Sequence, residues 1–486
     1  MKILAYGAQE MYRKANREQM TIDDFITPFG GKLLAENRWV KLAKAIPWDR
    51  IEDRYAERFG NCGNVAIPLR VALGSLLIRE KCRFSDEDTL EHIGENNYMQ
   101  YFIGYKEFKP GKPFVPSLMV EFRKRLNLEE IQRIIDETDD DGEGTPGTTG
   151  GEKVGEGGQE NNGALLIDAT CAPADIRYPT DLGLLNEGRE KLEEIVDAVW
   201  ENMMNKPDTK PRTYREEARK EYLKVEKQRK RSHKTIRKAI GKQLRYIRRD
   251  LETIGNILED RLLFSALTPR QYRNLLVITE FYRQQKEMFE NKKHSIEDRI
   301  VSISQPHVRP IVRGKTSAPV EFGAKVAVSK VNGCCRIETL SWDNFNEGTY
   351  LIEAIERYKV RFGCYPKVVL ADKLYRNRDN LAYCKKHEIR LSGPPLGRPK
   401  RDPTIDLKIE RMDAAERNGI ESPFGTCKRR YGLAKIMAKL QCTAETVIAL
   451  QFLVLNLEQK VRVSFCLLLR WLFGSVDMWF SLLLKA

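Results

Sequence analysis

The chain has 486 residues, enough for two to four domains, and its 41% hydrophobic content is ordinary for a soluble protein. Ten cysteines form no CxxC pair and no zinc-ligand spacing with the five histidines, which argues against a structural zinc site and predicts reduced thiols in the cytoplasm. The formal net charge is +14, and residues 206–250 hold 18 Lys and Arg against 6 Asp and Glu. This concentrated positive charge predicts a polyanionic partner, with DNA or RNA first, although a solvated helix face remains the alternative.

Residues 1–136 are predicted to form a helical DNA-binding domain. The segment IPLRVALGSLLIREKCRF has apolar residues at helical spacing, and Ser85 follows as a predicted N-cap with Asp88 three residues later. Basic residues stand between the apolar positions, as in a helix-turn-helix module, but any small helical bundle gives the same pattern. The first residues, MKILAYGAQEMYRKANREQ, lack a long apolar core, so no signal peptide is expected.

Residues 137–163 are predicted to be a flexible linker. Glycine and acidic residues dominate this segment, and Val154 is its one large apolar residue. Such a composition cannot bury enough surface to offset the loss of chain entropy. The segment is therefore expected to tether the helical N-terminal domain to a second domain and, being acidic, to stay off DNA.

The second domain is predicted to begin in residues 164–184, with a strand at LLIDAT. Residues 185–300 form a basic helical insertion in which two or three long helices are expected. One of them keeps apolar residues at helical spacing, which predicts a packed helix or a coiled-coil pair. These residues are Ile236, Ile240, Leu244, Ile247 and Leu251.

Residues 301–460 are predicted to complete this domain. The Asn-Gly pair at 332–333 lies between two alternating runs, EFGAKVAVSK and CCRIETLSW, and predicts a hairpin turn. A helix (LIEAIERYKVRFG), a buried-type strand (KVVLAD), a short helix and the strand IRLSG follow. This order predicts an α/β fold: a mixed sheet flanked by helices, with a long helical insertion after the first strand.

The tail 461–486 is very apolar, but Arg470 and Asp477 interrupt it. A membrane span needs about 20 apolar residues without such interruptions. A C-terminal docking helix is therefore predicted, and an interfacial membrane helix is the alternative.

Two aspartates follow buried-type strands and are candidate metal ligands: Asp168 comes after LLI and Asp372 after VVLA. A rigid sheet fixes the separation of such aspartates, and Mg²⁺ prefers carboxylate oxygens. Two Mg²⁺ ions about 3.5–4 Å apart serve phosphodiester transfer by activating the attacking oxygen and stabilising the leaving oxygen. Either aspartate alone is more often only a strand-end cap.

The segment RNGIESPFGTCK places Arg417, Glu421 and Lys428 at intervals of four and seven. On a helix these residues share a face, so Glu421 is predicted to complete the metal site while the two cations hold phosphates. Arg429 and Arg430 follow directly and extend the predicted DNA face. The alternative is a surface salt-bridge ladder, which the same spacing produces.

Gly419 and Pro423 oppose a helix on either side of Glu421. The helix is therefore expected to kink there or to restart with Ser422 as N-cap and Pro423 in its first position. In the second case Glu421 would lie at a helix entry with an altered reach.

These motifs resemble those of bacterial insertion-sequence transposases of the DDE type, which have a ribonuclease-H-like catalytic domain. PLRVALGSLLIRE and SDEDTLEHIGENNYMQYFIG look like the family's helical N-terminal domain, and Asp168 looks like its first catalytic aspartate. LADKLYRNRDN is similar to the second-aspartate motif, with Asp372 and Tyr375 aligned. Residues 417–428 are similar to the family's Arg-x3-Glu-x6-Lys signature.

Two positions depart from the family pattern. Leu374 stands where the family usually has glycine, and Ala414 stands where it usually has tyrosine. Together with Pro423, these departures leave a degenerate, inactive copy as an alternative.

The resemblance implies a reaction in which water attacks the phosphodiester at a transposon end and the freed 3′-hydroxyl then attacks target DNA. The implied catalytic and metal-binding residues are Asp168, Asp372 and Glu421. The implied DNA contacts are Arg417, Lys428, Arg429, Arg430 and Tyr375. The implied cofactors are two Mg²⁺ ions, which Mn²⁺ can replace. The implied partners are terminal inverted repeats and target DNA, bound by a homodimer in the cytoplasm, at the nucleoid and away from any membrane.

Two further functions remain open. A metal-dependent nuclease of the same fold would hydrolyse DNA without joining it, whereas an inactive copy would bind DNA as a repressor of its own element. The P-loop motif GxxxxGK[ST] does not occur in the sequence, so ATP is not expected to take part.

Overall fold

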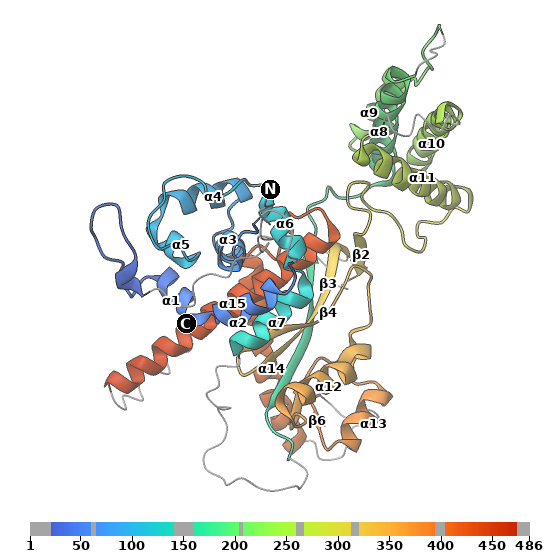
Figure 1. Ribbon diagram of the computed structural model, residues 1–486. Coiled ribbons are helices and arrows are strands. Elements are labelled where there is room, and N and C mark those ends of the chain that lie inside the picture. The colour runs from blue at the N-terminus through green and yellow to red at the C-terminus, as the bar shows by residue number, and fades with distance from the viewer. Residues whose placement is uncertain are drawn as a thin grey trace, which may run out of the picture. The chain divides into compact units, whose positions relative to one another are not determined.

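A computed structural model of the chain divides into two compact units, whose elements are shown in Figure 1. Unit 1 comprises Met1–Pro173, Lys325–Ser341 and Phe345–Ala486, and unit 2 comprises Ala174–Ala324 and Trp342–Asn344. The residues that the structure describes are 21–59, 65–139, 160–203, 208–258, 267–312, 320–393 and 404–473.

Unit 1 begins with a group of short helices. Their bounds are η1 (Ile22–Asp24), α1 (Arg38–Ala45), α2 (Trp48–Ala56), α3 (Leu69–Cys82), α4 (Asp86–Glu95), α5 (Asn97–Phe102), α6 (Leu118–Arg125) and α7 (Leu128–Asp139). Ser85 caps α4 and forms a capping box with Asp88, as the sequence predicts. In α3 even Ser75 and Glu80 are buried together with the apolar residues, so this helix lies at the centre of the group.

A six-stranded mixed sheet follows in the chain. Its strands are β1 (Ala164–Pro173), β2 (Arg309–Val312), β3 (Val320–Val331), β4 (Cys334–Ser341), β5 (Val368–Leu370) and β6 (Arg390–Leu391). The strand order is β2-β3-β1-β5-β6, and β4 also pairs with β3. β1, β5 and β6 are parallel, whereas β3 is antiparallel to β2 and β4. The predicted α/β class with a mixed sheet is confirmed; the ribonuclease-H-like topology stays a prediction.

β3 and β4 form the predicted hairpin. Asn332 and Gly333 between them have φ angles of 50° and 90°. Two consecutive residues with positive φ make a type I′ turn, for which Asn-Gly is the preferred pair because its twist matches that of the strands.

Helices pack against the strands of unit 1, which are all strands except β2 and the start of β3. The remaining elements of this unit are η3 (Glu347–Tyr350), α12 (Leu351–Phe362), η4 (Lys373–Tyr375), α13 (Arg378–Lys386), α14 (Thr404–Arg430) and α15 (Gln441–Phe473). One apolar core joins β1 and β5 to α12 and α13, and it includes Ile167, Val369 and Ile355. α15 packs against α1, α3, α6 and α7 and also against β4 and α14 (Figure 1). Because its residues from 444 to 457 are almost all buried, α15 holds the N-terminal helices and the sheet in one unit.

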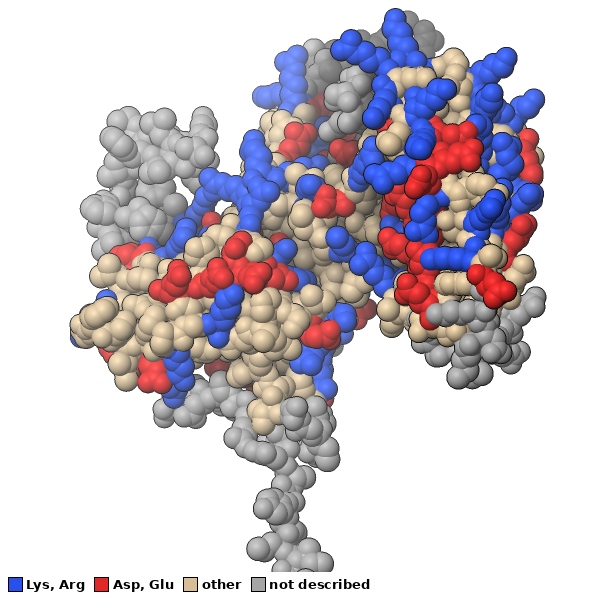
Figure 2. All heavy atoms as spheres, turned by 90° about the horizontal axis from the view of Figure 1, so that it is seen from above, with Lys and Arg blue, Asp and Glu red and all other residues tan. Residues whose placement is uncertain are grey.

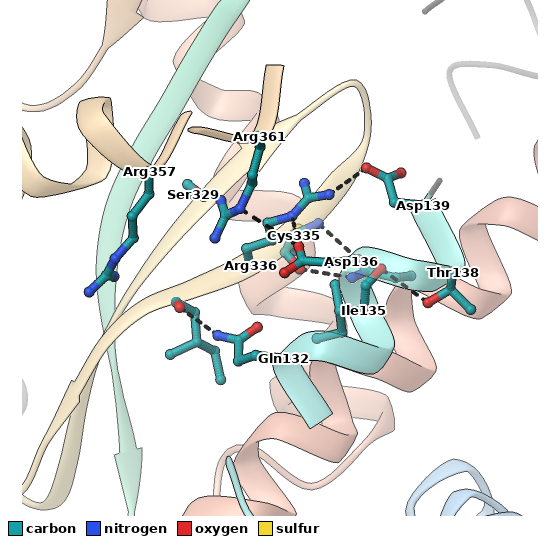
Figure 3. A network of polar contacts seen from close by, with 12 residues as sticks. Gln132, Ile135, Asp136, Thr138, Asp139, Ser329, Cys335, Arg336, Arg357 and Arg361 are labelled. Atoms are coloured by element: carbon teal, nitrogen blue, oxygen red, sulfur yellow. Dashed lines mark hydrogen bonds and ion pairs between the residues drawn. The ribbon is translucent and has the colours of Figure 1, made fainter. Parts of the chain in front are cut away.

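A polar network also ties α7 to β4 (Figure 3). Arg336 of β4 is buried and donates to the carboxylates of Asp136, at 2.7 Å, and Asp139. Gln132 of α7 donates to the carbonyl of Ile337. Buried charge is tolerated here because both carboxylates pair with the guanidinium.

The predicted linker differs from the structure at its start. Residues 137–139 belong to α7, and the N-terminal helices share one compact unit with the sheet. Residues 140–159 of the predicted linker lie outside the described residues.

The predicted C-terminal helix does not begin at residue 461, because α15 runs without a break from Gln441 to Phe473. Residues 474–486 lie outside the described part of the chain. Within the part that is described, no helix has both the length and the apolar character that crossing a membrane requires.

Most of the described part of unit 2 consists of helices: three long ones of 21, 26 and 22 residues, where the sequence predicts two or three long helices, and a shorter one of 12 residues. They are α8 (Asp181–Glu201), α9 (Arg215–Glu226), α10 (His233–Leu258) and α11 (Pro269–Glu290). Four of the five residues of the predicted apolar stripe of α10 face their common core: Leu244 and Ile247 are buried, and Ile240 and Leu251 pack against them, whereas Ile236 does not belong to this core. The charged insertion is therefore a packed helical body.

Candidate active site

Asp168 and Asp372 come from neighbouring strands at matching positions. β1 pairs in parallel with β5, and the last pair in register is Leu166 with Leu370. Each aspartate comes two residues after this pair, so the register places the two side by side on strands about 4.8 Å apart. Asp372 follows the end of β5 as predicted, whereas Asp168 lies within β1, which continues to Pro173.

Asp168 is a partly buried carboxylate among other charges. Its Oδ1 accepts a hydrogen bond of 2.8 Å from the N–H of Ala169. The pKa of Asp168 is raised to about 6, chiefly by burial. The hydrogen bond from Ala169 and the charge of Arg417 lower this pKa, whereas the negative charges of Glu347 and Asp372 raise it. Two neighbouring carboxylates thus disfavour a further negative charge here, and a cation bound among them would relieve that repulsion.

Asp372 is held by a cation from α14. Arg417 Nη1 donates to Asp372 Oδ1 at 2.9 Å, and both side chains are partly exposed. Asp372 also caps η4, because the same oxygen accepts from the N–H of Lys373 at 2.7 Å. The predicted phosphate ligand Arg417 therefore neutralises one of the two aspartates in this structure.

Glu347 is a third carboxylate beside the aspartates, and sequence reasoning missed it. It begins η3, where Asn346 is the N-cap, and its charge raises the pKa of both Asp168 and Tyr375. Lys325 of β3 binds Glu347 Oε1 at 2.9 Å, with both side chains largely buried. No local pattern marks Glu347, because it comes from a short turn that only the tertiary fold brings to the site.

Tyr375 is fully buried, which does not fit its implied role as a DNA contact. Its ring belongs to the core between the sheet and α12. Among the described atoms its hydroxyl has no hydrogen-bond partner. Burial raises the pKa of Tyr375, and the charges of Glu347, Asp168 and Asp372 raise it further, so the hydroxyl remains a protonated donor beside three carboxylates.

α14 carries the predicted Arg-Glu-Lys face without restarting at Ser422, since Pro423 lies inside the helix. Gly419 faces Leu166 of β1, whose Cδ2 lies 3.5 Å from the position a Cβ would take. Strand alternation puts Asp168 on the same face of β1 as Leu166. Glu421 comes two residues after Gly419 and one turn after Arg417, so its exposed side chain lies on the Arg417 side of the helix and not on the side that meets Leu166.

The predicted basic residues after Glu421 lie in the last turns of the same helix. Lys428 is partly buried, whereas Arg429 and Arg430 are exposed. The two exposed arginines are thus accessible to a phosphate backbone.

Among the described residues, no group of three or more Asp, Glu, His or Cys side chains lies close enough to hold a metal ion. The structure therefore does not bring Asp168, Asp372 and Glu421 together as a group of three metal-binding carboxylates. Mg²⁺ does not require such a group, because it keeps several waters and is bound through one or two carboxylates plus substrate phosphates. The hard oxygen donors of the aspartate pair, together with the unpartnered hydroxyl of Tyr375, fit a hydrated ion.

Comparisons with known proteins find transposase family models that match two parts of the chain. A family model described as "Transposase DDE domain" matches residues 369–458, and one described as "Transposase domain (DUF772)" matches residues 29–125. The resemblance to DDE transposases is confirmed. The first match contains Asp372, Arg417 and Glu421, and the second covers most of the N-terminal helices.

A curated relative from Rhizobium meliloti, "Uncharacterized protein ORF8 in nfe locus", is 27% identical over 142 residues. This region is 29% of the chain, and it spans 64% of the relative's length. No solved structure matches the chain.

Proposed function

We propose that the chain is a metal-dependent transposase that hydrolyses the phosphodiester at transposon ends and joins the freed 3′-hydroxyl to target DNA. One observation carries this proposal: Asp168 and Asp372 stand in register on neighbouring strands of a chain that carries two transposase domains. Inserted helices and a mixed sheet support the ribonuclease-H-like assignment. Cutting both transposon ends together would require at least a dimer on the DNA.

Asp168, Asp372 and Glu421 are the residues that would hold two Mg²⁺ ions, which Mn²⁺ can replace. Bound divalent ions supply Lewis acidity for the attacking and leaving oxygens. α14 carries both Glu421 and Arg417, which lies one turn before it. Arg417 binds Asp372, so the helix that carries Glu421 also contacts the second aspartate. When a scissile phosphate enters, Arg417 can pair with it in place of Asp372, which leaves that carboxylate free to bind an ion.

The helices of unit 2 supply a surface for DNA. α9, α10 and the segment between them expose a set of cations, defined here as the basic surface. These residues are Arg219, Lys220, Lys224, Lys227, Arg229, Lys230, Lys234, Lys238, Arg245, Arg248 and Arg249. Figure 2 shows Lys and Arg side chains gathered on one face of the molecule with some Asp and Glu between them. Such a surface would bind the phosphate backbone without reading bases.

A strand-transfer assay with Mg²⁺ and a labelled terminal inverted repeat tests the proposal. The wild type is expected to nick the end and join it to target DNA. Asp168→Asn should abolish both steps yet still shift the DNA band, whereas Asp379→Asn, an exposed aspartate of α13, should behave as wild type. Nicking without joining would indicate a nuclease, and a band shift without any cleavage would indicate an inactive DNA-binding copy.

A further inference from the structure

A proline interrupts the hydrogen bonds of α14 next to Glu421. Pro423 lies inside the helix and has no N–H, so the carbonyl of Gly419, four residues earlier, receives no helical hydrogen bond. Backbone carbonyls in packed regions are nearly always paired, so this oxygen needs another donor. Without one, a helix is free to bend at its proline.

Lys330 of β3 supplies that donor. Its Nζ donates to the carbonyl oxygen of Gly419 at 2.8 Å, and its side chain is partly buried. The same turn of α14 lies against β1 through Gly419 and Leu166. Two strands of the sheet therefore contact the helix where its own hydrogen bonding is broken.

This contact lies between the two functional side chains of the helix. Gly419 comes two residues after Arg417 and two residues before Glu421. Bending of α14 at this turn would therefore move Glu421 relative to Arg417 and relative to the strand that carries Asp168.

We propose that Lys330 is a positioning residue for Glu421: its ammonium group replaces the hydrogen bond that Pro423 removes and restrains α14 from bending at this turn. The proposal rests on the proposed function of Glu421. Lys330 acts on the reaction through the helix and not through DNA, because its Nζ is bound to the carbonyl of Gly419.

The substitution Lys330→Met removes the donor and keeps the chain length. Single-turnover nicking should fall by about 10- to 100-fold, since a misplacement near 1 Å costs up to about 100-fold in rate. DNA affinity in a band-shift assay should stay unchanged. Lys386→Met, an exposed lysine of α13, is the control for loss of charge and should change neither quantity.

The double variant Lys330→Met with Pro423→Ala gives the decisive comparison. The substitution Pro423→Ala restores a backbone N–H that can bind the Gly419 carbonyl within the helix, so the missing lysine is no longer needed. Nicking by the double variant should return to at least the level of Pro423→Ala alone. Lys330→Met that nicks as fast as wild type, or a double variant that remains as slow as Lys330→Met, would overturn the proposal.

Hydrogen exchange provides a readout that does not depend on activity. Amides of α14 from 417 to 427 should exchange roughly tenfold faster in full-length Lys330→Met, the ratio expected for loss of one hydrogen bond to a charged donor. The double variant should restore slow exchange. If the wild type neither nicks nor joins DNA, the proposed function fails, but hydrogen exchange still tests whether Lys330 holds the Gly419 carbonyl. Unchanged exchange in Lys330→Met would refute the role of Lys330 in holding α14.

Discussion

Arg417 donates to Asp372 across 2.9 Å, from a helix to the end of a strand. Arg417 is proposed to bind DNA phosphates, and Asp372 is proposed to bind a metal ion, yet in this structure the two side chains pair with each other. In the proposed function, Arg417 and a metal ion compete for Asp372. DNA that takes over Arg417 would then free this carboxylate for the ion.

Arg417→Met should separate these two effects. Because the pair is partly exposed, it is worth about 0.2–1 kcal/mol, so its loss should tighten ion binding to the DNA-free chain by at most about fivefold. DNA binding should weaken, because a phosphate ligand is lost. Tyrosine-sensitised Tb³⁺ luminescence and a band-shift assay measure the two quantities, and weaker Tb³⁺ binding by Arg417→Met would contradict the competition.

Lys325 and Glu347 form a second pair beside Asp168, and it is more deeply buried than the first. Removing Lys325 leaves the buried carboxylate of Glu347 without its partner. The substitution Lys325→Met should therefore lower the free energy of unfolding by about 3 kcal/mol. The double variant Lys325→Met with Glu347→Gln should recover part of this loss, as shown by urea unfolding. Additive losses in the double variant would mean that the two side chains do not interact.

The local features of the fold follow from short sequence patterns. The capping box of Ser85 and the hairpin turn at Asn332 and Gly333 involve residues within four positions of one another, so backbone preferences alone decide them. The aspartate pair was predictable for a related reason: near-continuous apolar runs such as LLI and VVL are typical of buried parallel strands, and the parallel register of β1 and β5 aligns the residues that follow these runs.

The remaining features depend on contacts between distant segments. Pro423 predicts a helix break, but a lysine from β3 satisfies the carbonyl that the proline leaves open. Tyr375 belongs to a motif that suggests an exposed aromatic, yet the packing of η4 under α12 buries it. Glu347 precedes a helix that the sequence does predict, and only the fold places it beside Asp168.

Asp250 should make the stability of unit 2 depend on pH. It is buried on α10, and its pKa is raised to about 7, chiefly by burial and next by Glu193 of α8; Arg189, Arg249 and Arg215 lower it. Between about pH 4 and pH 7 the folded chain binds a proton that the unfolded chain has lost, so stability falls as pH rises, by at most about 1.4 kcal/mol per pH unit. Above pH 7 the buried carboxylate is charged, and stability no longer changes with the titration of Asp250.

The substitution Asp250→Asn removes the cost of burying a charged carboxylate. The difference in free energy of unfolding between this variant and the wild type should therefore grow from pH 4 to pH 7 and then stay constant. Hydrogen exchange of α8 and α10 in the full chain at pH 5, 7 and 8 measures the effect. Glu252→Gln, an exposed change on the same helix, should leave the pH dependence as it is. An advantage of Asp250→Asn that does not change with pH would assign its effect to packing.

The basic surface of unit 2 should set the salt dependence of DNA binding. Lys227, Lys230, Lys234 and Lys238 are exposed on or between α9 and α10. Each phosphate contact contributes about −0.9 to the slope of log K against log salt concentration, because binding releases condensed counterions. Changing all four lysines to Gln should therefore reduce the slope by up to about 3.6, whereas changing them to Arg keeps the charge and should leave it near the wild-type value.

Band shifts across a salt series with duplexes of several sequences separate this effect from base recognition, since lost phosphate contacts weaken binding to every duplex alike. A slope that is the same in the Gln and Arg variants would show that these lysines are solvated and that the DNA lies against other helices.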